Sequence, residues 1–208
     1  MPASPTVLWS AEPGERDGTP LVVALHGRGA DETSFAGLHQ HLPEGVTVAS
    51  VRAPISEGGG YAWFANRGIG RPVAESIAGT AAQLTRWLDE VQPHHSSVSL
   101  FGFSGGTAMA GGLLLLGPDR YASAVLLAGT LPWEAGFPTE PGRLDGVRIL
   151  YGRGELDQVI PADLIERTVS WLRDESGADL TERLYPGVGH GITAEELADV
   201  RAFLASVL

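Results

Sequence analysis

Residues 96–110 read SSVSLFGFSGGTAMA, and this stretch decides the fold. The part up to Phe101 is typical of a buried strand, and the part after Gly106 is typical of a buried helix. Between them, Gly102–Gly106 has the form G-x-S-x-G, with Ser104 at its centre. The backbone of such a central serine is strained, and only very small residues fit two positions to either side of it. The stretch therefore predicts a nucleophile elbow at Ser104; the alternative is a glycine-rich turn around an inert serine.

Short apolar runs alternate with segments of helical period on both sides of this stretch. Such alternation implies right-handed crossovers, a mainly parallel sheet and helices on both of its faces, which is an α/β fold. No linker or internal repeat divides the sequence, so we expect one domain over residues 1–208. The expected strands are Thr6–Ala11, Leu21–Leu25, Val46–Val51, Val98–Gly102, Ser123–Leu127, Val147–Tyr151 and Thr181–Tyr185.

Apolar residues at spacings of three and four predict the helices that separate these strands. Pro161 suits the first turn of a helix that runs to about Arg173. The least regular stretch, residues 132–143, is expected to be a surface excursion that passes over a site. The expected helical faces are Phe35, Leu38 and Leu42; Ile77, Ala81, Leu84, Leu88 and Val91; and Leu197, Val200, Leu204 and Val207.

The composition excludes several kinds of chemistry. The 208 residues include no cysteine and no lysine, which rules out thiol nucleophiles, thiolate metal sites, Schiff bases and P-loop lysines. The formal net charge of −11 repels nucleic acid and anionic membranes, so we expect neither as a partner. Residues 1–18 lack the basic start and apolar run of a signal peptide, and no apolar stretch approaches the ~20 residues that span a membrane. We therefore expect a cytoplasmic protein.

A serine hydroxyl needs a base to become a good nucleophile, and the base needs a carboxylate that fixes its tautomer. In enzymes with this elbow, the acid and then the histidine follow the serine along the chain. Of the six histidines, only His190 follows Ser104, and it lies between Gly189 and Gly191 after the last expected strand. We therefore expect His190 to be the base, in a loop that its glycines allow to reach over the edge of the sheet.

The acid is expected just after the penultimate strand, where two carboxylates lie. Asp157 comes directly before the apolar segment Val159–Ile160 and the start of a helix, and it is the favoured acid. Glu155, two residues nearer the strand, is its rival. Asp157 also has a second interpretation, as an ordinary carboxylate at a helix N-terminus.

A tetrahedral intermediate needs hydrogen-bond donors aimed at its oxyanion. The backbone N–H of Gly105, directly after the nucleophile, is one expected donor. Residues 25–31 (LHGRGAD) follow an early strand, and their glycines let the backbone approach a ligand, so the N–H of Arg28 is the second. His26 precedes the serine and lies at a strand end, so we expect it to brace this loop rather than to act as a base.

Aromatic side chains are expected to wall an apolar pocket for the acyl group. Trp63 and Phe64 are the expected substrate-binding residues, and Tyr61 and Trp133 are further candidates. Plain core packing is the alternative for each of them. An exposed Trp or Phe patch around the pocket would support a homodimer, which the sequence leaves open.

Five short motifs, spread over the chain, occur together: His26–Gly29, Trp63–Phe64, Gly102–Ser104, Gly154–Pro161 and Gly189–His190. With these motifs the chain resembles the phospholipase/carboxylesterase family of α/β-hydrolases, which includes acyl-protein thioesterase-like enzymes. The resemblance spans roughly residues 21–208. It implies an α/β-hydrolase fold in which Ser104 is the nucleophile, Asp157 the orienting acid and His190 the base. No large lid insertion is evident in the sequence, so we expect a minimal lid. Two positions depart from the family's common pattern, because Gly105 stands where Gln is common and Ala65 where Asp is common.

Together these expectations predict a serine hydrolase that cleaves carboxylic esters or thioesters of small to medium acyl chains through an acyl-enzyme. The alternative is a non-catalytic protein of the same fold that binds a small molecule or a partner, but such a protein does not need nucleophile, acid and base together. Metal-dependent hydrolysis is a third hypothesis. His39 with His41, and His94 with His95, offer nitrogen ligands, yet neither pair has a spaced carboxylate partner, so no metal and no cofactor are expected.

Overall fold

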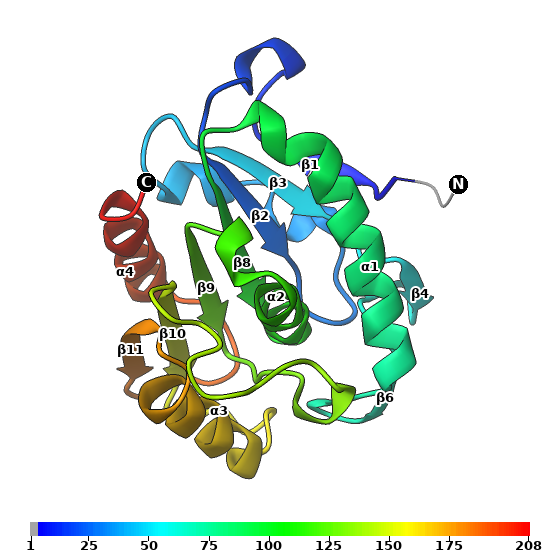
Figure 1. The fold of residues 1–208 in the computed structure, drawn as a ribbon, viewed down its shortest axis with the longest axis vertical. Helices are drawn as coiled ribbons and strands as arrows, with labels where there is room; N and C mark the ends of the chain where they lie inside the picture. The colour runs from blue at the N-terminus through cyan, green and yellow to red at the C-terminus, as the bar shows by residue number, and fades with distance from the viewer. Residues whose placement is uncertain (1–3) are drawn as a thin grey trace.

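The computed structural model describes residues 4–208, so residues 1–3 of the expected domain lie outside the described part. Within residues 4–208, the centre is a seven-stranded sheet in the order β1-β3-β2-β8-β9-β10-β11 (Figure 1). Its pairs are parallel except that β1 runs antiparallel to β3. The strands are β1 (Val7–Trp9), β2 (Leu21–Leu25), β3 (Thr47–Val51), β8 (Val98–Phe103), β9 (Ser123–Leu127), β10 (Arg148–Gly154) and β11 (Asp179–Tyr185).

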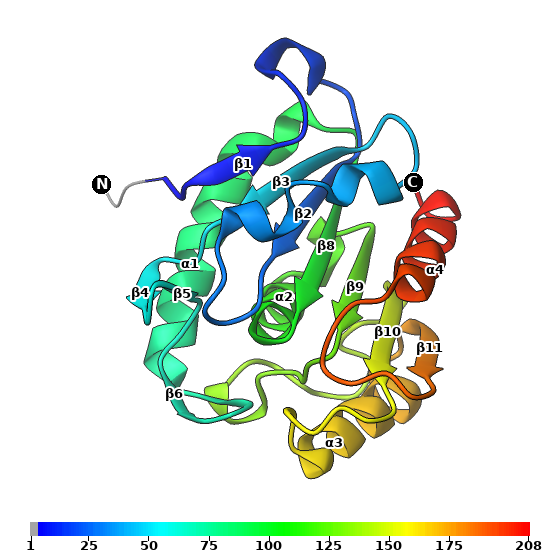
Figure 2. The ribbon, with the colours of Figure 1, turned by 180° about the vertical axis from the view of Figure 1, so that it is seen from behind.

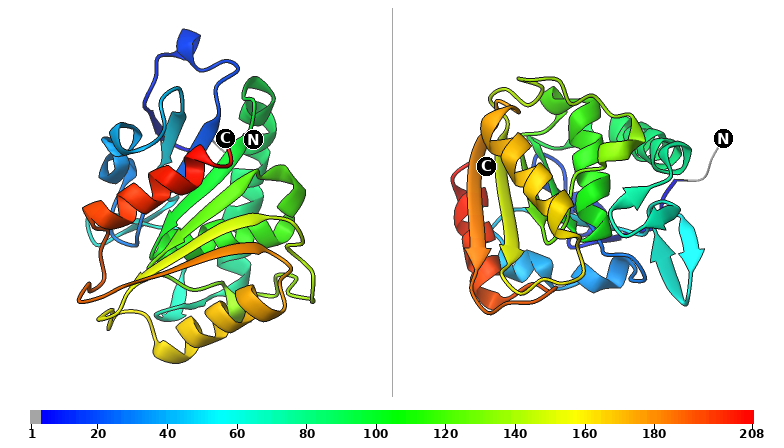
Figure 3. Two further views of the ribbon diagram at one scale, coloured as in Figure 1. Left: turned by 90° about the vertical axis from the view of Figure 1, so that its left-hand side faces the viewer. Right: turned by 90° about the horizontal axis from the view of Figure 1, so that it is seen from below.

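The seven expected strands and the mainly parallel sheet are confirmed. The largest difference in bounds is at β10, which continues to Gly154 because it stays paired with β11 up to the Gly154–Tyr185 pair. The carboxyl ends of the parallel strands gather at one edge of the sheet, which the right-hand view of Figure 3 faces. Ligands of open α/β sheets bind beyond this edge, so the functional residues are to be sought there.

Helices cover both faces of the sheet, as the sequence predicts (Figures 2 and 3). On one face, α1 (Ala74–Val91), α2 (Gly105–Leu116) and α3 (Ala162–Asp174) pack over the larger apolar cluster. On the other, α4 (Ala194–Ala205) packs over the smaller one. α2 is buried over nearly its whole length, which accounts for its apolar, glycine-rich sequence, whereas α1 buries one stripe. No helix of residues 4–208 combines the length and the apolar character needed to cross a bilayer.

The prediction of one helical face through Phe35, Leu38 and Leu42 is wrong. The segment forms two short 3₁₀ helices separated by Gly37, η2 (Glu32–Phe35) and η3 (Leu38–His41). Gly37 has φ of −98° and ψ of 0°, outside the helical region, so the two short helices do not join. The three apolar side chains nevertheless pack on the same face of the sheet as α4.

Two β-hairpins that the sequence analysis did not predict lie between β3 and α1. β4 (Ile55–Glu57) pairs with β5 (Gly60–Ala62), and β6 (Asn66–Gly68) pairs with β7 (Arg71–Pro72). Figure 1 shows both hairpins beside α1. Strands of two or three residues are too short to display an alternating pattern, so hydrophobic periodicity does not indicate them.

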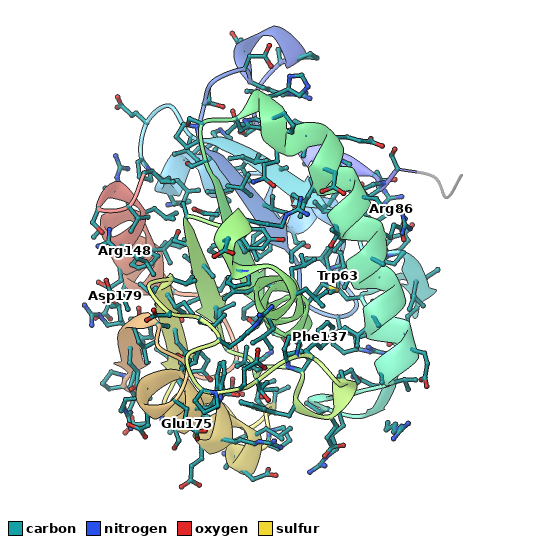
Figure 4. The ribbon with its side chains drawn as sticks, viewed as in Figure 1. Trp63, Arg86, Phe137, Arg148, Glu175 and Asp179 are labelled. Carbon is teal, nitrogen blue, oxygen red and sulfur yellow. The ribbon has the colours of Figure 1, made fainter. Side chains whose placement is uncertain are left out.

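The expectation that residues 132–143 pass over a site is wrong. This segment contains a 3₁₀ helix, η6 (Trp133–Ala135), and its aromatic side chains are partly buried against the larger apolar cluster. The ring of Trp133 meets that of Trp171 edge-on, with centroids 5.7 Å apart. The ring of Phe137 lies against Gly112 of α2 (Figure 4). The excursion therefore packs against α2 and α3, and no residue of 132–143 lines the cavity described below.

Candidate active site

Ser104 occupies a sharp turn between β8 and α2. Its φ and ψ of +54° and −116° lie in a region that residues with a side chain rarely adopt, so the backbone is strained there. The N–H of Ser104 donates to the carbonyl of Leu127 at 3.0 Å, and its own carbonyl accepts from the N–H of Thr107 at 3.0 Å. These bonds hold the turn at the carboxyl end of the central strand.

The glycines two positions to either side of Ser104 have no room for a side chain. A Cβ on Gly102 would lie 2.6 Å from the carbonyl oxygen of Gly106. A Cβ on Gly106 would overlap the carbonyl of Leu25 at the end of β2. The first turn of α2 therefore lies directly against the backbone of two strands, and the G-x-S-x-G pattern has a steric cause.

His190 lies in the loop between β11 and α4 and joins the serine to a carboxylate. Its Nε2 is 2.9 Å from Oγ of Ser104, and its Nδ1 is 2.8 Å from Oδ2 of Asp157. The His190 side chain is 18% exposed and that of Asp157 is 1% exposed. The structure thus brings together three side chains that are 33 and 86 residues apart in sequence.

The carboxylate of Asp157 is fully engaged. While Oδ2 faces His190, Oδ1 accepts the N–H groups of Val159 at 2.8 Å and Ile160 at 3.3 Å. A carboxylate accepts and does not donate, so Nδ1 of His190 carries the proton of the shared bond. Asp157 is therefore at once the partner of the histidine and a cap for the turn that leads into α3, which joins the two interpretations that the sequence left open.

Glu155, the rival acid, makes a different contact. Its Oε2 accepts the N–H of Gly187 at 3.0 Å, three residues before His190. The backbones of the two loops are also joined, because the N–H of Leu156 donates to the carbonyl of Val188 at 2.8 Å. Glu155 therefore binds the loop that carries the histidine and not the imidazole itself.

The loop after β2 and the start of α2 each carry one of the two backbone N–H groups that the sequence analysis expects to face an oxyanion. The backbone N–H groups of Arg28 and Gly105 have no acceptor within residues 4–208. They lie close together, since a Cβ on Gly105 would be 3.4 Å from the Arg28 nitrogen. Both residues also line the cavity beside Ser104. Two free donors next to a serine hydroxyl form an arrangement that suits a developing negative charge.

His26 braces this loop, as expected. The N–H of Ala53 donates to its Nε2 at 3.1 Å, so Nδ1 holds the ring proton and donates to the carbonyl of Gly27 at 2.7 Å. The indole N–H of Trp63 donates to the His26 carbonyl at 2.7 Å. Burial lowers the pKa of His26, in agreement with a neutral ring that accepts on one side and donates on the other.

A cavity of about 300 Å³ opens beside Ser104 and His190. Trp63 and Phe64 both line it, and Figure 4 shows Trp63 between α1 and α2, where it is almost fully buried. Tyr61 and Trp133 do not line it; both are partly buried and pack against the larger apolar cluster, which is the core-packing alternative. The Tyr61 ring also faces the Arg52 guanidinium at 4.7 Å, and Trp133 packs on Trp171. Aromatic residues therefore occur both in the cavity wall and in the core, and residue type alone does not distinguish the two.

Sequence reasoning missed much of the cavity wall. The β6–β7 hairpin contributes Asn66 and Ile69, α2 contributes Ala108, and the segment after β9 contributes Thr130. None of these stands out by periodicity or motif. The apolar segment Val159–Ile160, which the sequence analysis used only to place Asp157, also lines the cavity.

The remaining histidines lie away from this cavity. His95 bonds Thr19, and His94 lies 3.7 Å from a carboxylate oxygen of Asp17. Over residues 4–208, no group of three His, Asp or Glu side chains is placed to hold a metal ion.

The sheet order, the strained elbow and the loops gathered at the carboxyl edge are those of an α/β-hydrolase. A family model described as Phospholipase/Carboxylesterase matches residues 10–208. The chain therefore belongs to the phospholipase/carboxylesterase family and is an enzyme of the hydrolase class.

Three distant relatives are similar to this chain over nine tenths or more of their length. Acyl-protein thioesterase 1 of Candida albicans is 24% identical, over 90% of this chain and 91% of that protein. The carboxylesterase of Bacillus cereus superposes with a TM-score of 0.85 at 21% identity, covering 100% of this chain and 96% of that one. A carboxylesterase from Mesorhizobium loti superposes with a TM-score of 0.79 at 25% identity, covering 91% and 90%. These relatives support hydrolysis of an ester or a thioester.

Proposed function

We propose that the protein hydrolyses carboxylic esters, and also thioesters, through a catalytic triad of Ser104, His190 and Asp157. The observation that carries this proposal is the continuous hydrogen-bond chain from Ser104 Oγ through both nitrogens of His190 to Asp157. A non-catalytic binding protein has no need of this chain at the mouth of a cavity.

The geometry supports a division of roles. Asp157 accepts a hydrogen bond from the Nδ1–H of His190, which leaves Nε2 unprotonated and facing the serine hydroxyl. Nε2 takes the hydroxyl proton as Oγ attacks the acyl carbon, and His190 then returns that proton to the departing alcohol or thiol. Water hydrolyses the acyl-enzyme with His190 again as the base. The N–H groups of Arg28 and Gly105 are the proposed donors to the oxyanion.

A fluorophosphonate probe and the Ser104→Ala variant test the triad together. The wild type should be labelled, because an activated serine attacks the probe, and Ser104→Ala should not. The substitution should also lower kcat by about 10⁴–10⁶, with the oxyanion donors supplying the remaining rate. A folded Ser104→Ala protein that keeps more than a tenth of wild-type activity contradicts the proposal, and an unlabelled, inactive wild type favours the non-catalytic alternative.

The cavity supports small to medium acyl groups. Its volume of about 300 Å³ is at the lower end of the ~300–1,000 Å³ that is typical of small-molecule pockets, which favours a small to medium acyl group. A series of p-nitrophenyl esters of rising chain length tests this. We expect kcat/KM to peak at a short or medium chain, and a steady rise through long chains would contradict the size limit.

A homodimer and a cytoplasmic location remain predictions. The aromatic patch that would support a dimer is not present, because the large apolar side chains exposed among residues 4–208 are aliphatic. Two of them, Ile69 and Val159, flank the cavity. Light scattering of the purified protein measures the oligomeric state directly.

A further inference from the structure

The β4–β5 hairpin and the loop that follows β2 are joined along their backbones. The N–H of Gly29 donates to the carbonyl of Tyr61 at 2.9 Å, and the N–H of Tyr61 donates to the carbonyl of Ala30 at 2.9 Å. A Cβ on Gly60 would overlap the carbonyl of Gly29. The hairpin therefore lies in direct backbone contact with the loop that carries the Arg28 N–H, and displacement of one displaces the other.

The side chain of Arg28 adds a second connection at this point. Its Nε and Nη2 donate to the two carboxylate oxygens of Glu57, each at 2.6 Å, at the tip of the hairpin. Its Nη1 donates to the backbone carbonyl of Phe64 at 2.8 Å, in the cavity wall. One guanidinium thus joins three parts of the site: the loop itself, the hairpin tip and the wall of the cavity.

This ion pair is not placed where it would contribute much to stability. The side chains of Arg28 and Glu57 are 30% and 45% exposed, and exposed ion pairs are typically worth less than ~1 kcal/mol. The forked, two-point geometry does, however, fix the direction of a guanidinium. Since the same residue supplies the proposed oxyanion donor, anchoring its guanidinium limits how far the attached backbone, and with it the N–H, can shift.

We propose that Glu57 is a positioning residue: through the Arg28 guanidinium it aims the Arg28 N–H at the oxyanion. The inference rests on the proposed function, because it needs a tetrahedral intermediate to act upon. Misplacing a donor by about 1 Å costs up to ~10²-fold in rate, whereas complete loss of one donor costs ~10²–10³-fold. Removal of the Glu57 carboxylate should therefore reduce the rate of the chemical step and leave substrate binding largely unchanged.

The test compares Glu57→Ala and Arg28→Met, separately and together. Arg28→Met keeps the backbone N–H, so any loss reports on the side chain alone. We expect kcat to fall about 10–100-fold in each single variant, with KM within about threefold of wild type and no further fall in the double variant. The affinity for a trifluoromethyl ketone, whose adduct with the serine places an oxyanion in the same position, should weaken in parallel with kcat.

The Asp89→Ala variant is the matched control. Arg120 and Asp89 form an ion pair at 2.7 Å with exposures of 27% and 58%, similar to those of the Arg28–Glu57 pair, but neither residue lines the cavity. We expect Asp89→Ala to keep wild-type kcat. Glu57→Gln, which preserves side-chain length and one acceptor oxygen, should show a smaller loss than Glu57→Ala, and it serves as the test if the alanine variant does not fold.

Three results would overturn the inference. The first is a kcat within twofold of wild type in folded Glu57→Ala, or in folded Glu57→Gln where only that variant folds. The second is a loss confined to KM, and the third is an equal loss in Asp89→Ala. In each case labelling of Ser104 by the fluorophosphonate would persist, so the proposed hydrolase would stand without this positioning role. A wild type that is neither labelled nor active removes both proposals together.

Discussion

The glycines beside Ser104 and those beside His190 look alike in the sequence but meet different physical requirements. At the elbow, Gly102 and Gly106 have backbone atoms where a Cβ would lie. Beside the histidine, Gly189 and Gly191 have nothing within 4 Å of that position. Close backbone contacts therefore require glycine on both sides of Ser104. No such contact requires glycine on either side of His190.

Hydrogen bonds hold the histidine half in place. The loop is tied to the segment after β10 by the Glu155–Gly187 bond and by the backbone bond from Leu156 to Val188. The steric exception is Gly154, where a Cβ would overlap the carbonyls of Val188 and Gly189. This contrast predicts that substitutions at the elbow act on folding, whereas substitutions in the histidine half act on the alignment of the imidazole.

Among the substitutions that test this contrast, Gly106→Ala should have the largest effect. The added methyl group would collide with backbone at the end of β2, which cannot move without disturbing the central strands. We expect the free energy of unfolding to fall by about 3 kcal/mol and activity to fall more than a hundredfold. Urea denaturation and an ester assay at a temperature where the variant is folded measure the two effects.

Gly79→Ala is the control for this variant. Gly79 lies within α1 with open space around its Cβ position, so alanine should stabilise the helix by up to ~1 kcal/mol. Equal stability of Gly106→Ala and wild type would show that the elbow tolerates a side chain and would remove the steric half of the comparison.

Gly154→Ala should come next, with a loss of about 10²-fold in kcat/KM and a smaller loss of stability. The methyl group pushes on the carbonyls of Val188 and Gly189, and so moves the imidazole of His190 away from Ser104. Gly189→Ala, in open space and with an ordinary φ, should remain within threefold of wild type. If the two variants lose activity equally, the loop is sensitive to any substitution and the distinction between them fails.

These contrasts also show which parts of the molecule the sequence reveals. The strand–turn–helix around Ser104 and the order of Ser104, Asp157 and His190 are predictable, because they depend on local pattern and chain order. The choice between Asp157 and Glu155 was not settled by spacing, since both carboxylates lie in one loop and only the folded backbone aims one of them at the ring.

The cavity wall was less predictable than the triad, for a physical reason. Ile69 lies in a hairpin too short for periodicity, and Thr130 lies in an irregular segment after β9. Tyr61 and Trp133 share the aromatic character of Trp63 but pack elsewhere, because residue type does not determine which side of a hairpin or turn faces the cavity. Which residues form the cavity wall depends on how the loops pack, and loops have the weakest sequence patterns.

Glu155→Gln tests the hydrogen-bonded half with a smaller change. Glutamine keeps an acceptor for the Gly187 N–H but removes the charge that strengthens the bond. We expect kcat to fall about two- to fivefold, with the melting temperature nearly unchanged because Glu155 is exposed. A loss of about 10⁴-fold would instead identify Glu155 as the acid, against the contact made by Asp157.

Glu196→Gln should have the smallest effect, and one of opposite sign. Glu196 lies in the first turn of α4, just beyond the histidine loop, and is fully buried. Its Oε2 accepts the N–H of Thr193 at 2.8 Å, while Oε1 has no partner within residues 4–208. Burial raises the pKa of this carboxyl above its ordinary value near 4.5. The folded state therefore binds more protons than the unfolded state between 4.5 and the raised pKa, so Glu196 loses its favourable contribution as pH rises through that window.

Above that window the buried charge destabilises the fold, and glutamine removes the charge while keeping a carbonyl acceptor for Thr193. We expect Glu196→Gln to be more stable than wild type by up to ~1 kcal/mol at pH 8, a shift of roughly 2–4 °C in Tm, with the difference closing as pH falls toward 4. Glu196→Ala loses the hydrogen bond as well and should be less stable than Glu196→Gln at every pH. Thermal melts of the three proteins across this range separate the contribution of the bond from that of the charge. A gap between wild type and Glu196→Gln that does not change with pH would mean that the charge has no part in it, and that hydrogen bonding and packing alone hold this end of the histidine loop.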